Sequence, residues 1–581
     1  MSVLRKLDAR VVGQAARKES RNREVTLPPV SMYRWWARRT VAVNDAILSG
    51  RSPGVLVDPF AGGGVIPLVA LRLGWEVFAQ DINPWACHGL ESVLSLTDLE
   101  ALKADVADLQ PVGEALSTEV YGTTFRDGGS AQVAHTFRVA VAPCPACGVS
   151  QRLFPHALIS GVRRRDRGGD PGAFLACRRG HVFRGVREGT QDCPQCALGV
   201  DPAARYTPGR VVHCEGCGHR GRISDRGPLQ WEVVLVERAG QGVRELDLPT
   251  PREIDLAERR WPTSLDLGPI PEGRETRVLL RHGFRSWVDL YPHRQRYVLE
   301  ALLARTSGAL RLAVVGTAEM AGLCSRWDRW YLKSYESMAG HRFNFTTLTV
   351  EPNVWGLKEA GRGTVRRRTR SLVKAARWMS ENVSGKARVS CGSSESLAVS
   401  SSVADLVLTD PPYHDDVEYG ELSLPLRAWA GLAQQALDGE AIGGAGRDYR
   451  GIMTRIFSEC RRVLKPGGHL IFSFANRDPE AWVVLFEALQ EAGFWACACA
   501  AIHSENERDG TKRGVRACTL DLLLDLSPER PKEPCWVQIP GADAEADFLG
   551  RVAHGFSQVG QLHGDWAAAL RGALRSSAFL A

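Results

Sequence analysis

The sequence predicts an α/β protein with a mostly parallel central sheet, and three segments carry this prediction. Residues 55–64 form an apolar run that enters a glycine turn, and residues 65–73 continue with helical spacing. Residues 75–84 contain a second strand-like run that ends on an acidic residue. Residues 404–409 form a third apolar run followed by two prolines, which is typical of a strand buried on both faces of a parallel sheet.

The glycine turn, Gly62-Gly63-Gly64, predicts a ligand site at the end of the first strand. Glycines let the backbone pass close to a ligand, and the helix that follows presents its N-terminal amides. Asp81 ends the next strand, where dinucleotide-binding folds carry the carboxylate that binds ribose hydroxyls. The turn matches neither the phosphate loop GxxxxGK[ST] nor the pattern GxGxxG. Strand, glycines, helix, strand and acid in this order therefore predict a cofactor site.

The third apolar run ends in Asp410-Pro411-Pro412-Tyr413, the most informative segment of the chain. Ligands of open α/β sheets bind at the carboxyl ends of the strands, where this segment lies. The two prolines fix φ and hold the neighbouring groups in a constant relation. A carboxylate and a backbone carbonyl can accept the two N–H bonds of an amine, while the ring of Tyr413 stacks on a planar base. The segment thus suits a base that carries an amino group.

Together, these motifs resemble those of S-adenosylmethionine-dependent amino-methyltransferases that act on DNA bases. The resemblance is greatest to the adenine-specific DNA methylases that carry a zinc ribbon. It extends to the segment Tyr33–Arg39, to Cys144-Pro-Ala-Cys147-Gly, and to residues 410–423. It implies a Rossmann-like methyltransferase sheet interrupted by a large insertion with zinc ribbons.

The resemblance also implies roles for individual residues. Asp410 would accept an N–H of the target amine, a proline carbonyl of Pro411-Pro412 would take the second hydrogen, and Tyr413 would stack on the base. Asp58 would orient the methionine end of the cofactor, and Asp81 would bind its ribose. Within the segment Tyr33–Arg39, residues Arg34–Arg39 are expected to form an amphipathic helix that packs on the methionine moiety. The full implied cofactor set is Trp36, Arg38, Asp58, Phe60, Ala61, Gly62, Gly64, Asp81, Ile82 and Asn83.

Two departures from the family pattern bear on the target base. Relatives tend to have aromatic and Asn residues where this chain has His414, Asp415 and Asp416, and an acid where it has Gly392-Ser393-Ser394. Three hypotheses therefore stay open: an adenine-N6 DNA methyltransferase of a modification or phage-defence system, an amino-methyltransferase of cytosine N4 or of RNA, and an inactive zinc-ribbon protein that binds nucleic acid. The first implies DNA, with its target base flipped out, and further subunits of a defence system as partners.

Composition fits a multidomain globular protein. The chain has 581 residues, a net charge of +7, 44% hydrophobic and 24% charged residues. This length exceeds what one hydrophobic core usually serves. The chain shows neither a membrane-length apolar run nor a signal-peptide core, so we expect a cytoplasmic protein without membrane contact. The expected parts are a cofactor-binding half, a zinc-ribbon insertion, a helical target-recognition insertion, a catalytic half and a C-terminal extension, at residues 1–110, 111–228, 229–385, 386–530 and 531–581.

Of the 15 cysteines of the chain, seven lie between residues 144 and 217 together with His181, and these eight candidate ligands predict two structural zinc ions. Three CxxC pairs and one CxxxH pair in a short segment are hard to explain otherwise. A nested arrangement would join the first pair to the last, and a sequential one would join neighbouring pairs. The eight residues are Cys144, Cys147, Cys177, His181, Cys193, Cys196, Cys214 and Cys217.

Clustered arginines are candidates for phosphate contacts, although such runs are often solvated helix faces. The predicted nucleic-acid contacts are Arg366, Arg367, Arg368 and Arg370, and Arg163-Arg164-Arg165 form a second run. Between the motifs, residues 111–135 read as a loop and residues 240–275 as an extended connector. Residues 314–339 have helical spacing, which predicts that Trp327, Trp330, Tyr331 and Tyr335 lie in a core. Residues 495–501 and 519–526 predict a closing antiparallel hairpin.

Overall fold

The chain forms two compact units, each assembled from segments that are distant in sequence. The computed structural model describes residues 2–21, 26–162, 172–338, 340–413, 417–437, 439–442, 448–503 and 518–580. The first unit comprises Met1–Leu99, Lys374–Gly420 and Gln435–Ala581, and the second comprises Glu100–Val373 and Glu421–Gln434. The two runs Arg163–Arg165 and His414–Asp416 lie outside the described residues.

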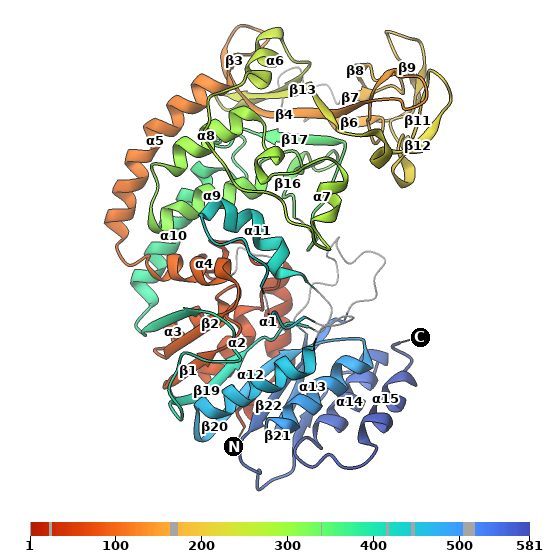
Figure 1. Cartoon of the computed structure of the whole chain (residues 1–581). Coiled ribbons are helices and arrows are strands. Elements are labelled where there is room, and N and C mark those ends of the chain that lie inside the picture. Colours follow the sequence, from red (N-terminus) through yellow and green to blue (C-terminus); the bar gives the residue numbers. More distant parts are fainter. Residues whose placement is uncertain are drawn as a thin grey trace. The chain divides into compact units, whose positions relative to one another are not determined.

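An eight-stranded sheet forms the centre of the first unit (Figure 1). Its order is β18-β2-β1-β19-β20-β22-β21-β23, and all neighbours are parallel except β22, which runs antiparallel to β20 and β21. This confirms the predicted α/β class with a mainly parallel sheet, and the predicted closing hairpin is β21–β22. The strands are β1 (Val55–Asp58), β2 (Glu76–Asp81), β18 (Ala387–Cys391), β19 (Ala404–Thr409), β20 (Leu464–Phe474), β21 (Trp495–His503), β22 (Leu520–Ser527) and β23 (Trp536–Gln538).

The strand order contains one switch point, which is where sheets of this kind bind ligands. Numbered along the unit, the first five strands have the order 3-2-1-4-5, which is the Rossmann order. The direction of winding reverses between β1 and β19, so their carboxyl ends flank the crevice where such sheets bind ligands. Asp58 ends β1 and Asp410 follows β19 directly. The two predicted sites therefore meet at one switch point.

Helices cover both faces of the sheet. One face carries α12 (Tyr449–Val463), α13 (Pro479–Glu491) and α14 (Ala544–Phe556), and the other carries α1 (Ala9–Arg21) and α2 (Val41–Ser49) (Figure 1). In α12 the apolar residues recur with helical spacing and are buried against the sheet. The remaining helices of the unit are α3 (Val65–Arg72), α4 (Pro84–Leu94) and α15 (Trp566–Arg575).

The second unit is built on a six-stranded antiparallel sheet whose longest strand, β4, pairs with most of the others. A buried carboxylate on this sheet, Glu351, accepts hydrogen bonds from Arg138 at 2.7 Å and from Arg294. These charges compensate one another, so the ion cluster fixes the helix of Arg294 to the sheet. The strands are β3 (Gly122–Thr124), β4 (Ser130–Pro143), β5 (Ser150–Arg152), β13 (Gln230–Gly240), β14 (Val243–Asp247) and β17 (Leu348–Pro352).

Small sheets and helices complete the second unit. The small strands are β6 (Leu158–Gly161), β7 (Ala173–Ala176), β8 (Val182–Gly185), β9 (Gln191–Asp192), β10 (Gly199–Val200), β11 (Val211–His213), β12 (Arg220–Arg222), β15 (Arg326–Asp328) and β16 (Lys333–Tyr335). The helices are α5 (Leu99–Tyr121), α6 (Pro251–Glu258), α7 (Arg277–Arg281), α8 (His293–Leu303), α9 (Arg311–Met320), α10 (Val365–Asn382) and α11 (Tyr419–Ala430), of which α5, α10 and α11 cross the division between the units.

Two loop predictions for this unit are wrong. Residues 111–121, expected to be a loop, continue the long helix α5 through Pro111. Gly113 is needed there because an added Cβ would lie 2.2 Å from the ring of Trp355, so the glycine reflects close packing and not a turn. The connector expected at residues 240–275 contains β14 and α6, and α6 begins with a capping box formed by Thr250 and Glu253.

The prediction of a helix over residues 314–339 is also wrong beyond Met320. Helix α9 ends at Met320, and Gly322 follows with a φ of 86° that an L side chain rarely adopts. The chain then forms the β15–β16 hairpin. Its tip residues Trp330 and Tyr331 are 55% and 77% exposed, so they do not belong to a core.

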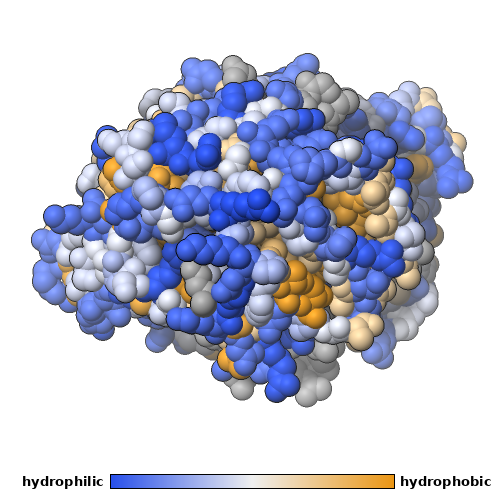
Figure 2. Space-filling view, turned by 90° about the horizontal axis from the view of Figure 1, so that it is seen from below, coloured by the Kyte–Doolittle hydropathy of each residue, from blue (hydrophilic) through white to orange (hydrophobic). Residues whose placement is uncertain are grey.

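No helix in the described ranges combines the length and apolarity needed to cross a membrane. The face of the molecule in Figure 2 is mostly hydrophilic and is interrupted by a few hydrophobic areas.

Candidate functional site

The carboxyl ends of β1 and β19 are joined by a side-chain hydrogen bond. The hydroxyl of Thr409, the last residue of β19, donates to Asp58 Oδ1 at 2.7 Å. The backbone N–H of Phe60 donates to the same oxygen at 3.1 Å. These two bonds fix the Asp58 carboxylate and connect the glycine turn to the strand that precedes Asp410.

Asp58 is a buried acid with one oxygen still to be satisfied. Its side chain is 1% exposed, and its Oδ2 has no hydrogen-bond partner among the described residues. Burial raises the pKa of Asp58 to about 7, and the bonds from Thr409 and Phe60 oppose this shift. A buried oxygen without a partner is costly, so a cationic or N–H-bearing ligand group at Oδ2 would relieve the penalty.

Asp81 holds the glycine turn in place. Its two carboxylate oxygens accept the backbone N–H of Gly62 and of Asn83, both at 2.8 Å. Burial raises its pKa to about 6, and these two bonds partly offset the rise. Each oxygen keeps a second lone pair, so the ribose role that the resemblance implies is compatible with this geometry. Ile82 and Asn83 follow directly, and Asn83 caps α4 by accepting the N–H of Trp85 at 3.0 Å.

The segment Tyr33–Arg39 is not helical, contrary to the prediction. Its backbone is irregular, and the segment forms hydrogen bonds with the glycine turn and with α4 instead of the internal bonds of a helix. The hydroxyl of Tyr33 donates to the Gly62 carbonyl at 2.8 Å, and Trp85 Nε1 donates to the Arg34 carbonyl at 2.8 Å. Arg38 donates to the Tyr33 carbonyl, which a helix would have used internally. Long-range bonds thus replace the helical ones.

One tryptophan of this segment, Trp35, lies against the turn. A Cβ on Gly62 would lie 2.6 Å from Trp35 Nε1, and the Trp35 ring stacks on Tyr419 at 5.0 Å and 6°. Gly62 and Gly64 have φ values of 44° and 71°, which favour glycine as well. Trp36 is buried, and its Nε1 has no hydrogen-bond partner in the described part of the chain. Phe60 and Ala61 lie between Asp58 and the turn.

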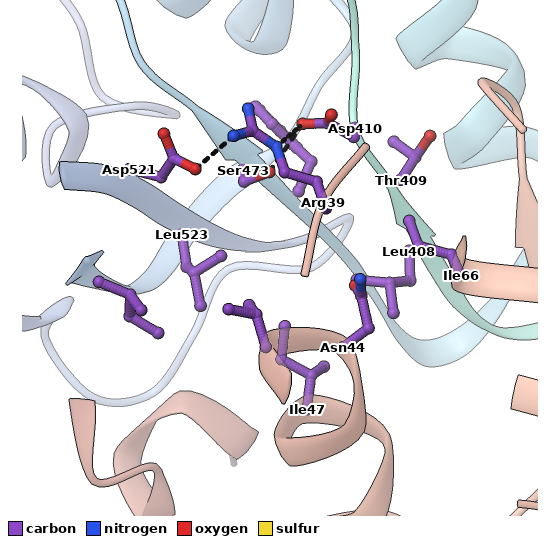
Figure 3. A pocket seen from close by; sticks show the side chains of 13 residues that line it. Arg39, Asn44, Ile47, Ile66, Leu408, Thr409, Asp410, Ser473, Asp521 and Leu523 are labelled. Atoms are coloured by element: carbon purple, nitrogen blue, oxygen red, sulfur yellow. Dashed lines mark hydrogen bonds and ion pairs between the residues drawn. The ribbon is translucent and has the colours of Figure 1, made fainter. Parts of the chain in front are cut away.

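Asp410 is held by an arginine that the sequence did not single out for this role. Arg39 Nε donates to Asp410 Oδ1 at 2.8 Å, and its Nη1 forms an ion pair with Asp521 Oδ2 at 2.5 Å. Figure 3 shows the guanidinium between the two carboxylates. The hydroxyl of Ser473 donates to the same Asp410 oxygen at 2.7 Å. Asp521 and Ser473 lie on β22 and β20, and only the folded sheet brings them to Asp410.

Tyr413 packs against the same arginine. The guanidinium of Arg39 lies 4.9 Å from the centre of its ring, and Phe474 meets the ring edge-on at 4.9 Å. The carbonyl of Pro412 accepts the hydroxyl of Tyr449 at 3.1 Å. Of the two proline carbonyls, Pro411 is therefore the better candidate for a ligand N–H.

A pocket lies next to this network. Its volume is about 380 Å³, including the solvent at its opening. Its polar lining residues are Arg39, Asn44, Thr409, Asp410, Ser473 and Asp521. Apolar side chains of α2, α3, β19, β20, β21 and β22 line the rest (Figure 3). The carboxylate of Asp410 thus borders a hollow with mostly apolar walls, a setting in which its hydrogen bonds are stronger than in water.

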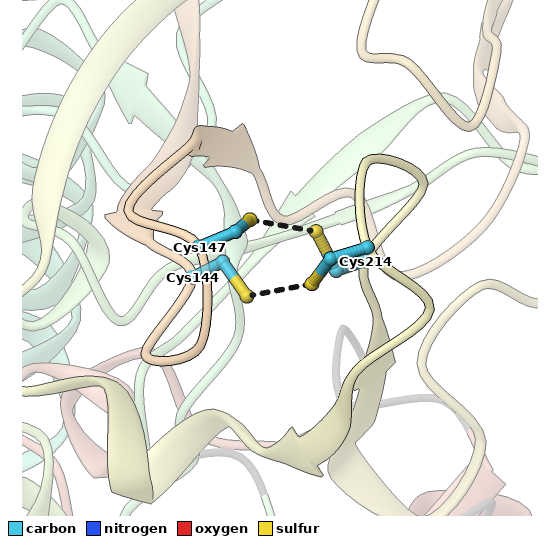
Figure 4. Close-up of side chains that lie close together, drawn as sticks. Cys144, Cys147 and Cys214 are labelled. Carbon is cyan, nitrogen blue, oxygen red and sulfur yellow. Dashed lines mark hydrogen bonds between the residues drawn. The ribbon is translucent and has the colours of Figure 1, made fainter.

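The eight candidate metal ligands form two groups of four, and the grouping is the nested one. Cys144 and Cys147 meet Cys217 and Cys214 with sulfur–sulfur distances of 3.7 and 3.8 Å (Figure 4). In the second group, Cys177 lies 3.8 Å from Cys196, and Cys193 lies 3.7 Å from His181 Nδ1. Tetrahedral zinc with Zn–S bonds of about 2.3 Å requires sulfurs about 3.8 Å apart. Both groups could hold a metal.

A third group of this kind lies in the first unit and was not predicted. His469, Cys497 and Asp525 meet on three neighbouring strands. His469 Nδ1 lies 2.6 Å from Asp525 Oδ1, and Ser2 donates to the other oxygen. These bonds satisfy the buried Asp525 without an ion.

The structure separates the arginines of the 366–370 run. Arg367 and Arg370 are exposed on α10. Arg366 lies 3.9 Å from Glu114, and Arg368 packs against Gly316 of α9, where a Cβ would meet its Nη1 at 2.6 Å. Only Arg367 and Arg370 therefore present their charges fully to solvent.

Comparisons with known proteins add little to this geometry. Neither models of protein families nor curated protein sequences match the chain. Among solved structures, a geranyl diphosphate methyltransferase in complex with GPP and sinefungin is similar at 11% identity and a TM-score of 0.15. The match covers 30% of this chain and 62% of that protein, and it is too weak to bear on fold or function.

Asp58 should make the stability of the protein depend on pH. Its folded pKa of about 7 lies above the ordinary 3.8, so the folded state keeps a proton that the unfolded state releases. The retained proton stabilises the folded state fully below about pH 4. This stabilisation, up to about 4 kcal/mol in the free energy of unfolding, is lost as the pH rises to about 7. Asp58→Asn cannot titrate, and its stability should fall less over this window.

Denaturant unfolding of both proteins at pH 5 and pH 8 measures this difference. The titration of Asp81 is common to both proteins, apart from its charge interaction with Asp58. Parallel pH dependences of wild type and Asp58→Asn would contradict the assignment.

Proposed function

We propose that the first unit transfers a methyl group from S-adenosylmethionine to the exocyclic amine of a DNA base, most specifically adenine N6. The observation that supports this most is the pairing of Asp58 and the Asp410–Tyr413 segment at the switch point of the sheet. The end of β1 has the features of a cofactor site, and the end of the neighbouring strand β19 has those of a site that binds an amine. The resemblance of both motifs to zinc-ribbon DNA methylases points to the same reaction.

The residues around the glycine turn fit the proposed cofactor. When bound, S-adenosylmethionine supplies an electrophilic methyl group on a sulfonium. Asp58 Oδ2, buried and without a described partner, would accept the ammonium of its methionine end. Trp36 Nε1 offers a buried donor, and Asp81 retains lone pairs for ribose hydroxyls. Because Trp35 covers Gly62, its ring has to move when a ligand reaches the turn.

The Asp410 segment would bind and orient the amine. Both contacts that hold Asp410 are made to Oδ1, so Oδ2 is proposed to accept one N–H of the base. The Pro411 carbonyl would accept the other, and the Tyr413 ring would stack on the base. Accepting an N–H increases electron density on the nitrogen. Positioning accounts for most of the proposed rate enhancement, and no covalent intermediate with the protein is required.

Arg39 is proposed as a positioning residue. It bonds to Asp410, pairs with Asp521 and lies over the Tyr413 ring, so it fixes both the acceptor and the stacking group. This preorganisation lets the site bind the amine without rearranging Asp410 during the reaction.

DNA is the proposed partner, and the target base must leave the duplex to reach Asp410. Arg367 and Arg370 remain proposed phosphate contacts, because they are the exposed members of their run. A place in a modification or phage-defence system is proposed from the resemblance alone. Cytosine N4 and RNA bases would use the same groups at Asp410 and are outcomes of the test below.

The two cysteine groups are proposed to bind structural zinc. Their sulfur spacings match a zinc tetrahedron, and all four positions of each group are occupied by protein ligands, which is typical of structural sites. The Cys144/Cys217 group would then close the base of the segment that carries the second group.

Asp410→Ala should abolish methyl transfer and leave cofactor binding intact. We expect the rate to fall by at least about 100-fold, because the amine loses its acceptor. The affinity for S-adenosylmethionine should change by less than about twofold, since Asp58 and Asp81 are untouched. Asp410→Asn, which keeps the shape and one oxygen, is the matched control and should also be strongly impaired.

Mass spectrometry of nucleosides measures the product after wild-type protein has acted on DNA or RNA, and calorimetry measures cofactor binding. Methylated adenine in DNA supports the proposed adenine-N6 activity. N4-methylcytosine or a methylated RNA base would instead identify that base as the substrate. Wild type that binds S-adenosylmethionine but methylates no nucleic acid would leave only the inactive zinc-ribbon hypothesis or another acceptor.

Metal analysis of wild-type protein purified without chelator should find two zinc ions per chain. Cys177→Ser should lose one ion and leave the Cys144/Cys217 group loaded, because the two groups share no ligand. Cys144→Ser should disturb both. Cys535→Ser, outside both groups, is the control and should keep two ions. One ion or none in wild type, or equal loss from both cluster variants, contradicts the nested assignment.

A further inference from the structure

The turn between β15 and β16 displays two large aromatic side chains to solvent. The strands pair in register from Arg326 with Tyr335 to Asp328 with Lys333. Between them, Trp330 is 55% exposed and Tyr331 is 77% exposed. The other tryptophans of the chain are buried or half-buried, so the exposure of Trp330 is unusual for this protein. Two exposed aromatic rings next to each other indicate a surface that could bind a partner.

Local hydrogen bonds hold this turn in one conformation. Asp328 Oδ1 accepts the backbone N–H of both Trp330 and Tyr331 at 2.9 Å, and the Asp328 carbonyl accepts the N–H of Leu332 at 2.7 Å. Leu332 has a φ of 53° and is itself buried. This backbone angle is unfavourable for an L residue. At this angle the Leu332 side chain is buried, whereas the rings of Trp330 and Tyr331 before it are exposed.

The base of the hairpin is firmly attached. Trp327 Nε1 donates to the hydroxyl of Ser160 at 2.9 Å, and its ring meets Phe137 edge-on at 5.1 Å. The N–H of Gly161 also donates to the Arg329 carbonyl at 3.4 Å. Ser160 and Gly161 belong to β6, the neighbour of the strand that leads into Cys177. The aromatic tip is therefore carried on a rigid support.

Cations surround the exposed rings. Arg329 lies 5.7 Å from the Trp330 ring centre, and Lys333 lies 5.4 Å from that of Tyr331. Arg362 and Lys333 both lie 5.2 Å from the ring of Tyr335. Of the nearby acids, Asp328 is engaged by the turn, and Glu336 lies 3.9 Å from Arg362. The surface thus combines π faces with an excess of positive charge.

We propose that this tip, formed by Trp330 and Tyr331 with Arg329, Lys333 and Arg362, stacks on unpaired nucleobases of a DNA strand while the cations contact its phosphates. Aromatic rings bind any base through its π face, and flanking Arg and Lys neutralise the backbone. A protein partner would be favoured by aromatic residues in an apolar patch, whereas these rings lie among cations. The proposal rests on the proposed function, because a base-flipping enzyme exposes unpaired bases.

The test uses the full-length protein and a single-stranded oligonucleotide that contains 2-aminopurine. Binding of wild type should change the 2-aminopurine fluorescence. Trp330→Ala with Tyr331→Ala should weaken binding by about 30-fold or more, because each stacked ring contributes about 5- to 150-fold, and should remove most of this change. Trp330→Phe with Tyr331→Phe should restore binding to within about threefold, because stacking needs only the rings. Thermal melting verifies that each variant is folded.

Two further variants separate stacking, charge and non-specific effects. Ile254→Ala removes another exposed apolar residue of the same unit and should leave binding unchanged. Replacing Arg329, Lys333 and Arg362 with Gln should flatten the salt dependence, by about 0.7 in slope for each phosphate that the variant no longer neutralises. The fluorescence change at saturating concentration should remain.

Wild-type affinity in the folded Ala pair would overturn the proposal and leave the tip for a protein partner. If the variant Trp330→Phe with Tyr331→Phe binds as weakly as the Ala pair, stacking by the rings is excluded. If wild type stacks bases but yields no methylated nucleoside, the proposed function fails and this inference stands. If wild type methylates DNA and the Ala pair binds normally, the inference fails alone. Absence of any nucleic-acid binding would reject both.

Discussion

The hydrogen bond from Thr409 to Asp58 joins the two halves of the candidate site, and the geometry of that site depends on it. The partners are 351 positions apart, and the strand reversal between β1 and β19 makes them neighbours. Because the second unit is inserted between β2 and β18, the sheet has to pair strands from both sides of that insertion. The bond also fixes the orientation of a carboxylate that lies against the glycine turn. A separate bond from Gly62 to Asp81 ties this turn to the next strand.

Buried carboxylates in the two units differ in whether neighbouring arginines compensate their charge, which distinguishes a structural acid from one that can bind a ligand. In the second unit, Glu351 is fully buried between two arginines, which hold its pKa below the ordinary value in spite of burial. Asp58 is equally buried but has no arginine, and its pKa rises. A structural charge is compensated within the fold, whereas an acid left short of partners at a strand end is prepared for a ligand. This contrast fits the proposed cofactor role of Asp58.

Local patterns in the sequence predicted those parts that local chemistry determines. The strand and glycine turn around Asp58, the buried strand before Asp410 and the two groups of cysteines follow from runs of a few residues. Predictions failed where distant contacts decide the conformation. The segment from Tyr33 is irregular because the glycine turn and Trp85 take its hydrogen bonds. Helix α5 continues past Pro111, and Gly113 packs there on Trp355, a contact that no neighbouring residue in the sequence reveals. The nested pairing of the cysteines was one of two arrangements that spacing allowed.

Arg39 shows why the catalytic half could not be completed from sequence. It lies in the segment that was expected to pack on the methionine end of the cofactor, yet its side chain is directed to Asp410 and Asp521. Two carboxylates and one guanidinium formally leave one negative charge beside the proposed amine site. A neutral amine that gains a methyl group carries positive charge until it loses a proton. A net negative site favours that developing charge over the neutral ground state, which is the condition for catalysis by electrostatic preorganisation. Without Arg39, two acids would repel each other at this position, and Asp410 would lose the fixed orientation on which acceptance of the N–H depends.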